Sequence, residues 1–483
     1  MDKNSKSKAA KNIFITGIAQ GWRLVTSFLL TIITARYLTP ADFGILAMVA
    51  SATALIALVK DLGISQAVIQ SQMITPGQIN SLFWVSTIAA IILSILLALS
   101  APVLASFYAE PRVEGLTIAA AALLFVSGPQ SVPTALLNRE SKFNALAIID
   151  VTSAALSVLV GVIAVVLWRS YWALFASAVM GTVVSAVGCW YFSKYRPAAP
   201  HIDWKSSHLI QFGSQLSGFN LLNYLSRNAD NVLIGRFLGG DQLGLYDRAY
   251  RLLLFPLNQL HGPIGQVLIP LLSRIQNDPT KYRSTYADTI SIMMMVAQPG
   301  ILLATMFAPQ VFVLLLGDQW IGAAPIFQWL GIAALHQIVT STGGWLFISQ
   351  GRGREFLMLG VYGSILTVTS FVIGLPWGAV GVAASYTIGN CLVMVPLVWT
   401  SIGRRGAISC WDLITIVSPH ILATLASAAL LWIAPTFLSG STALQVAQLG
   451  LLSYTAYLCV IVLFASKREL IHRTIRLAAR NKR

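Results

Sequence analysis

The segment IFITGIAQGWRLVTSFLLTIITA (residues 13–35) opens the chain with an apolar run interrupted by one charged residue, Arg23. A helix of about 20 apolar residues crosses the hydrocarbon core of a bilayer. The segment is long for a signal peptide and lacks an A-x-A cleavage site, so we interpret it as an uncleaved span. Further apolar segments bring the predicted number of spans to fourteen: 43–60, 80–106, 115–137, 146–168, 172–193, 209–235, 246–272, 286–316, 324–347, 356–374, 379–400, 413–434 and 444–465.

The composition of the whole chain supports a membrane protein. Of the 483 residues, 56% are hydrophobic and only 10% are charged, against about 25% charged in soluble proteins. Fourteen spans need roughly 280 residues, which leaves almost nothing for an ATPase half, an ectodomain or an appended catalytic domain. The sequence contains no P-loop, HExxH or GxSxG motif and no Cys/His cluster, so we expect neither an enzyme nor a metal site.

Basic residues are distributed unevenly between the two predicted sides of the membrane. Of the 32 Lys and Arg residues, 24 lie on the side that holds both chain ends, six lie on the other side, and two fall inside spans. This asymmetry predicts cytoplasmic N- and C-termini. It also accounts for most of the net charge of +15 without a nucleic-acid partner. The basic tail 466–483 has apolar residues near helical spacing, which suits either a helix on anionic lipid or a plain topology anchor.

An internal repeat organises the chain. The pairs match at a constant offset of 200 residues: Arg36 and Arg236, Leu38 and Leu238, Gly44 and Gly244, Gln66 and Gln266. A weaker echo pairs Arg139 and Phe143 with Arg352 and Phe356. Two parallel repeats of six spans around a central cavity are a common transporter design. We therefore predict an all-α membrane fold with six-helix bundles at 1–200 and 201–403. Two extra helices and a basic cytoplasmic tail would occupy 404–483.

Two arginines lie inside the opening spans of the two repeats. Arg23 and Arg227 sit roughly 20 Å and 14 Å below the outer edge, at 1.5 Å per helical residue. A charge in a span is costly and usually faces a water-filled cavity. Because guanidinium groups suit phosphate, both arginines are candidates for binding an anionic headgroup. An ion pair with Asp230, three residues further on, is an equally good interpretation of Arg227.

Polar residues gather in the seventh predicted span. Asn220, Asn223 and Tyr224 could bind a sugar by hydrogen bonding and stacking, or could bridge neighbouring helices. Asp230 is a candidate site for a coupling H⁺ or Na⁺. Asp150 falls near a span end, where we expect it to meet interfacial water. His420 is interpreted as a packed, hydrogen-bonded residue.

Several motifs resemble those of one family. Residues 35–44 (ARYLTPADFG), 138–143 (NRESKF), 230–239 (DNVLIGRFLG) and 317–320 (GDQW) resemble bacterial polysaccharide flippases of the Wzx type. The likeness is greatest to the colanic-acid-exporter-like branch of the multidrug/oligosaccharidyl-lipid/polysaccharide superfamily, and it extends through most of the chain.

The resemblance implies a function and its partners. It implies two six-helix bundles around a cavity and a flippase that carries undecaprenyl-diphosphate-linked oligosaccharide to the periplasmic leaflet of the bacterial inner membrane by alternating access. Cationic residues in the cavity would meet the diphosphate, and a polysaccharide polymerase is a further expected partner. Two alternatives stay open: a cation-coupled drug antiporter on the same fold, and a membrane polymerase. Scarce buried acids argue against the first, and short predicted outer loops argue against the second.

Overall fold

The computed structural model describes residues 3–61, 68–69, 71, 74–200, 207–437 and 441–480, and this part of the chain contains helices but no strand. Nine of its helices are long and apolar enough to cross a membrane. A bent pair, α5 (Arg112–Ser127) and α6 (Ser131–Arg139), qualifies as a tenth span. The chain is therefore a multi-pass all-α membrane protein, as predicted. The number of fourteen spans stays a prediction.

The helices divide between two compact units, Met1–Gly244 and Leu245–Arg483. The predicted bundle limits at residues 200 and 403 stay predictions. Besides α5 and α6, the first unit holds α1 (Lys3–Ala35), α2 (Pro40–Asp61), α4 (Pro76–Tyr108), α7 (Phe143–Trp168), α8 (Trp172–Ser193) and the first part of α9 (Ser207–Arg274).

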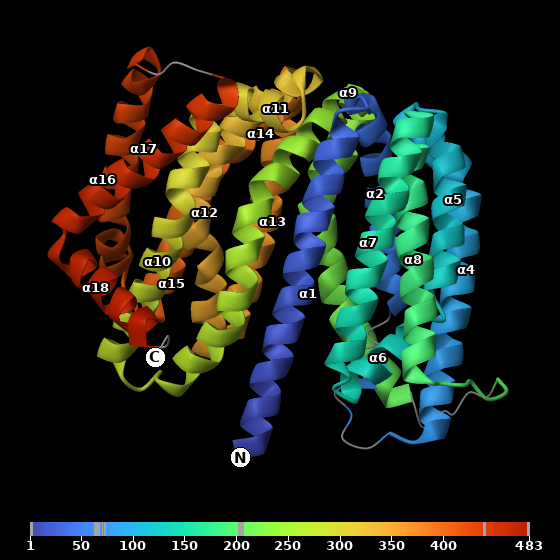
Figure 1. Cartoon of the computed structure of the whole chain (residues 1–483). Helices are drawn as coiled ribbons and strands as arrows, with labels where there is room; N and C mark the ends of the chain where they lie inside the picture. Colours follow the sequence, from blue (N-terminus) through green and yellow to red (C-terminus); the bar gives the residue numbers. More distant parts are fainter. Residues whose placement is uncertain are drawn as a thin grey trace. The chain divides into compact units, whose positions relative to one another are not determined.

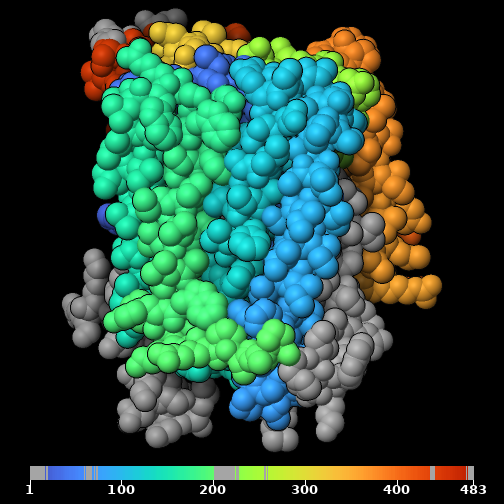
Figure 2. Space-filling model, turned by 90° about the vertical axis from the view of Figure 1, so that its right-hand side faces the viewer, coloured from blue at the N-terminus to red at the C-terminus, as the bar shows by residue number. Residues whose placement is uncertain are grey.

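Helix α7 is central to the packing of the first unit, because it lies against both α1 and α8 (Figure 1). A Cβ at Gly161 would lie 2.8 Å from Leu30 Cδ1 and 3.0 Å from Ser177 Cβ, so the close approach of these helices requires glycine. Figure 2 shows one side of this unit, including α4 and α8. On α4, Leu99 and Val103 are 71% and 68% exposed, as expected of side chains that face lipid.

The turn from α1 to α2 follows from its sequence. Pro40 is the first residue of α2, a position where its fixed φ suits a helix and its missing N–H costs nothing. The Thr39 hydroxyl and backbone N–H both donate to Asp42 Oδ2, at 2.8 and 3.0 Å. This capping arrangement ends the first span sharply and starts the second.

The second unit is organised around α10 (Pro279–Met306). It packs against α12 (Ala324–Ser349), α16 (Cys410–Ile433) and α17 (Thr442–Leu463). The other helices of the unit are the last part of α9, α11 (Ala308–Leu315), α13 (Gly353–Gly374), α14 (Gly378–Gly389), α15 (Val395–Arg405) and α18 (Ala465–Arg480).

Arg139 and Arg352, which correspond in the weaker repeat match, make the same kind of contact with the backbone. In the first unit, Arg139 Nη1 donates to the backbone carbonyls of Val68 and Ser71, both at 2.6 Å. In the second unit, Arg352 donates to the carbonyls of Ser401 and Ile402, at 2.6 and 3.2 Å. Each guanidinium therefore fastens a distant backbone segment at the end of a span.

We expect Arg139→Gln to lower the free energy of unfolding by about 2–3 kcal/mol, because hydrogen bonds from a charged group contribute about 1.5–3 kcal/mol. Lys142→Gln is the control, since its ion pair with Glu140 is exposed and worth at most about 1 kcal/mol. Thermal unfolding in detergent measures both. Equal unfolding temperatures for the two variants would contradict the anchoring role.

Candidate functional site

Arg23 lies in α1 of the first unit, and its side chain is exposed. It forms no ion pair among the side chains that the structure describes. One helical turn later, the Thr26 hydroxyl donates to the backbone carbonyls of Trp22 and Arg23, at 2.9 and 3.0 Å, which satisfies that polar group locally. The guanidinium is exposed on α1, and its role in binding an anionic headgroup stays a prediction.

Helix α9 carries the other predicted site residues. The Tyr224 hydroxyl donates to the backbone carbonyl of Ser51 on α2, at 2.9 Å. Asp230 is 2% exposed, and its Oδ1 accepts the backbone N–H of Asn231 at 2.8 Å. The Tyr224 contact is of the helix-bridging kind. The side chains of Asn220, Asn223 and Arg227 lie outside the described residues, so their roles stay predictions.

Helices α2 and α9 meet through glycines in the first unit. Gly239, with φ +84°, is the elbow at which α9 changes direction. A Cβ at Gly44 of α2 would overlap the carbonyl oxygen of Gly240, and a Cβ at Gly244 would overlap that of Pro40. Positions 40 and 44 correspond to 240 and 244 in the repeat, so the contact is reciprocal. This reciprocity agrees with the repeat inferred from the 200-residue offset.

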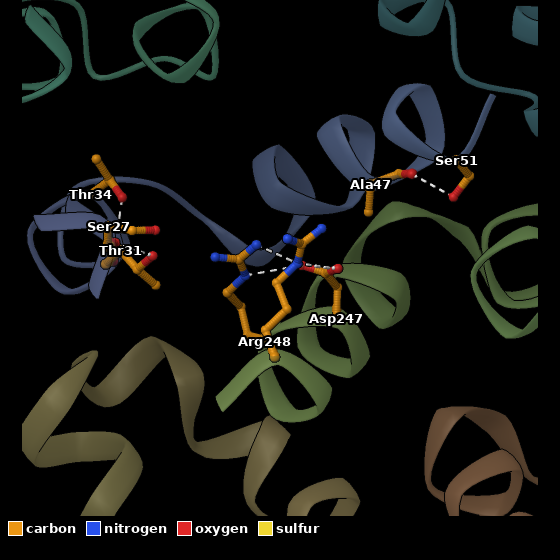
Figure 3. Close-up of polar contacts among 8 residues, drawn as sticks. Ser27, Thr31, Thr34, Ala47, Ser51, Asp247 and Arg248 are labelled. Atoms are coloured by element: carbon orange, nitrogen blue, oxygen red, sulfur yellow. Dashed lines mark hydrogen bonds and ion pairs between the residues drawn. The ribbon is translucent and has the colours of Figure 1, made fainter. Parts of the chain in front are cut away.

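An ion cluster around the buried carboxylate of Asp247 follows the elbow, in the second unit. Asp247 Oδ2 accepts from Arg248 Nη2 at 2.6 Å, and Oδ1 accepts from Arg251 Nε at 2.7 Å (Figure 3). Asp247 is 4% exposed. These residues were not singled out from the sequence. The four-residue spacing of Asp247 and Arg251 on one helix was the available signal for the pair.

A polar network joins the two extra helices to α10. Tyr457 Oη on α17 donates to Gln298 Oε1 on α10, at 2.7 Å, and lies 2.7 Å from His420 Nδ1 on α16. Since the tyrosine proton is used, His420 Nδ1–H must be the donor in its contact. This confirms the interpretation of His420 as a packed, hydrogen-bonded residue.

Helix α17 also contacts α10 beside a proline. Pro299 lies inside α10, where it has no N–H to donate within the helix. The Ser453 and Tyr454 hydroxyls of α17 donate to the carbonyls of Pro299 and Val296, at 2.9 and 2.8 Å.

Helix α18 packs against other helices of the second unit. Leu470 is 4% exposed in a cluster with Met295, Ala423 and Tyr457. The Lys467 ammonium donates to Ser291 Oγ at 2.6 Å and is buried. Burial lowers the pKa of Lys467, while the charge of Asp288 acts in the opposite direction. The buried side of this basic helix therefore contacts the rest of the second unit.

Comparison with known sequences identifies relatives along most of the chain. The family model described as "Polysaccharide biosynthesis protein" matches residues 33–325. The lipopolysaccharide biosynthesis protein WzxC of Escherichia coli (strain K12) is 27% identical over 399 residues, covering 78% of this chain and 79% of WzxC. The succinoglycan biosynthesis transport protein ExoT of Rhizobium meliloti (strain 1021) is 23% identical, covering 69% of each chain.

Solved structures show the same fold. The inward closed conformation of the lipid II flippase MurJ matches with a TM-score of 0.76 and 14% identity, covering 95% of this chain and 100% of MurJ. An inward-facing multidrug resistance MATE transporter of the MOP superfamily matches with a TM-score of 0.65 and 16% identity, covering 82% and 95%. The fold is thus that of MurJ and MATE transporters, and the chain belongs to the polysaccharide biosynthesis protein family.

Proposed function

We propose that the protein is a flippase that moves undecaprenyl-diphosphate-linked oligosaccharide from the cytoplasmic to the periplasmic leaflet. The observation that carries this proposal is the family match over residues 33–325, with WzxC and ExoT among the relatives. The likeness to the lipid II flippase MurJ supplies a fold suited to alternating access.

Arg23 fits this substrate class. It presents a planar array of donors in a membrane span, which suits a diphosphate. Arg227, Asn220 and Asn223 complete the proposed site, with the amides on the sugar. Tyr224 contributes its ring, since its hydroxyl is bound to Ser51. Asp230 is the proposed site of the coupling H⁺ or Na⁺.

The second candidate function is cation-coupled export of a small molecule, because MATE transporters share the fold. Cationic drugs need acidic partners in the site, whereas the exposed side chain of Arg23 is itself cationic. The named relatives belong to polysaccharide biosynthesis and transport, which favours the flippase over both an antiporter and a polymerase. The proposed setting is the bacterial inner membrane with both termini cytoplasmic and a polysaccharide polymerase as partner.

Translocation of lipid-linked oligosaccharide in proteoliposomes tests the function. We expect Arg23→Ala and Arg227→Ala to reduce the rate about ten- to a hundredfold, because a charge-assisted hydrogen bond contributes about 1.5–3 kcal/mol. Arg404→Ala is the control, since this arginine is exposed near the end of α15. Absence of translocation by the wild type would overturn the flippase proposal. Normal translocation rates in both variants would mean that the substrate binds at other residues.

A further inference from the structure

A carboxylate on α7 lies near Arg23. Asp150 is the eighth residue of α7 and is half-buried, so it lies about two helical turns inside the span. The charge of Arg23 acts on this carboxylate. Neither side chain forms an ion pair or a side-chain hydrogen bond with the described side chains.

Helix register explains why the two groups face each other. Helices α1 and α7 pack together and run in the same direction from the lower end of Figure 1. Their contact at Leu30 and Gly161 fixes the register. Arg23 precedes Leu30 by seven residues, and Asp150 precedes Gly161 by eleven. At about 100° per helical residue, each separation is within about 20° of a whole number of helical turns. Both side chains therefore lie on the faces that meet at this contact.

The difference in depth is small. Measured from the Leu30–Gly161 contact, Arg23 lies about 10 Å and Asp150 about 16 Å toward the helix N-termini. The Cα–Cβ bonds of a helix tilt toward its N-terminus, so the long arginine side chain extends toward the level of Asp150. The exposed guanidinium keeps donors open to a second anion on its other side.

We propose that Asp150 is a positioning residue that orients Arg23 and competes with the substrate diphosphate for it. This inference rests on the proposed function. Without substrate, the charge of Asp150 partly offsets that of Arg23 inside the span, where an uncompensated charge is costly, although the two groups form no direct ion pair. A bound diphosphate draws the guanidinium away from Asp150, and the attraction of the carboxylate for the guanidinium then assists release.

Binding of undecaprenyl diphosphate and of inorganic diphosphate to the purified full chain tests this competition. Asp150→Asn keeps the shape and removes the charge, so we expect about five- to tenfold tighter binding of both probes, together with a lower maximal rate of translocation. Arg23→Gln should weaken binding. In the Arg23→Gln background, Asp150→Asn should not increase the affinity for either probe, because the guanidinium for which Asp150 and the diphosphate compete is then absent.

Controls separate this role from a structural one. Thr152→Val is matched, since Thr152 lies on the same helix and its hydroxyl contacts only backbone carbonyls; it should leave affinity unchanged. Asp150→Glu should restore wild-type affinity. Unchanged or weaker binding by Asp150→Asn, or an equal gain without Arg23, would overturn the proposal. Binding requires no transport, so the result stays readable even if the wild type moves no lipid-linked glycan.

Discussion

Replacing Gly44 or Gly244 by alanine is expected to destabilise the protein by about 3 kcal/mol, at the upper end of the usual range for overpacking, and to abolish transport. Each new Cβ would overlap a backbone carbonyl oxygen, of Gly240 or Pro40, and a backbone cannot turn aside as a side chain can. Thermal unfolding in detergent and translocation in proteoliposomes measure the two effects.

The reciprocity of this contact makes the prediction sharper. Because the two glycines are equivalent in the repeat, their alanine variants should be similarly unstable, and the double variant should cost less than the sum. Gly262→Ala in α9 is the control, since no atom lies within 4 Å of a Cβ there; it should be neutral or slightly stabilising. Wild-type behaviour of Gly44→Ala would mean that α2 and α9 are not in close contact.

The second large effect is expected for Tyr457→Phe, which should lower the free energy of unfolding by about 2–4 kcal/mol. The change leaves His420 Nδ1–H without its acceptor, and a buried unsatisfied group costs about 1–3 kcal/mol. It also removes the shorter of two bonds to Gln298 Oε1, which keeps only the 3.4 Å bond from Thr424 Oγ1. Thermal unfolding of the purified protein measures the loss.

Two comparisons test whether the network is responsible. Tyr454→Phe removes a more exposed hydroxyl with one acceptor, so it should cost about 1 kcal/mol. Adding His420→Leu and Gln298→Leu to Tyr457→Phe should recover much of the stability, because removing all partners leaves no orphaned group. A triple variant as unstable as Tyr457→Phe alone would indicate that packing of the ring, not hydrogen bonding, is lost.

Much of the fold could be predicted because a membrane span depends mainly on the apolar residues within its own segment of the sequence. The predicted span 172–193 coincides with α8, and 413–434 differs little from α16. The segment 115–137 was predicted as one span, but Gly128 and Pro129 interrupt it, and α5 and α6 meet with a 44° bend. A loop was expected between the seventh and eighth spans. Gly239 instead joins them directly, because its positive φ turns the chain in one residue.

Only part of the candidate site was visible in the sequence. Arg23 was recognised because a charge in an apolar run is conspicuous. Asp150 was dismissed because its depth depends on where α7 begins, and its relation to Arg23 depends on a contact between helices far apart in the chain. The same holds for Tyr457 and Gln298, which are 159 residues apart. No periodicity or spacing in the sequence indicates such a pair.

The polar contacts around Pro299 make α10 dependent on α16 and α17. Acyl chains carry no hydrogen-bond donor, so lipid could not replace Ser453 and Tyr454 at the carbonyls of Pro299 and Val296. Without α16 and α17, these carbonyls would lose the hydroxyl donors, and Gln298 Oε1 would lose its bond from Tyr457 and face hydrocarbon. Helices α16 and α17 therefore shield polar groups of α10 from lipid, and a chain without them would need an apolar residue in place of Gln298 to keep α10 stable in the bilayer.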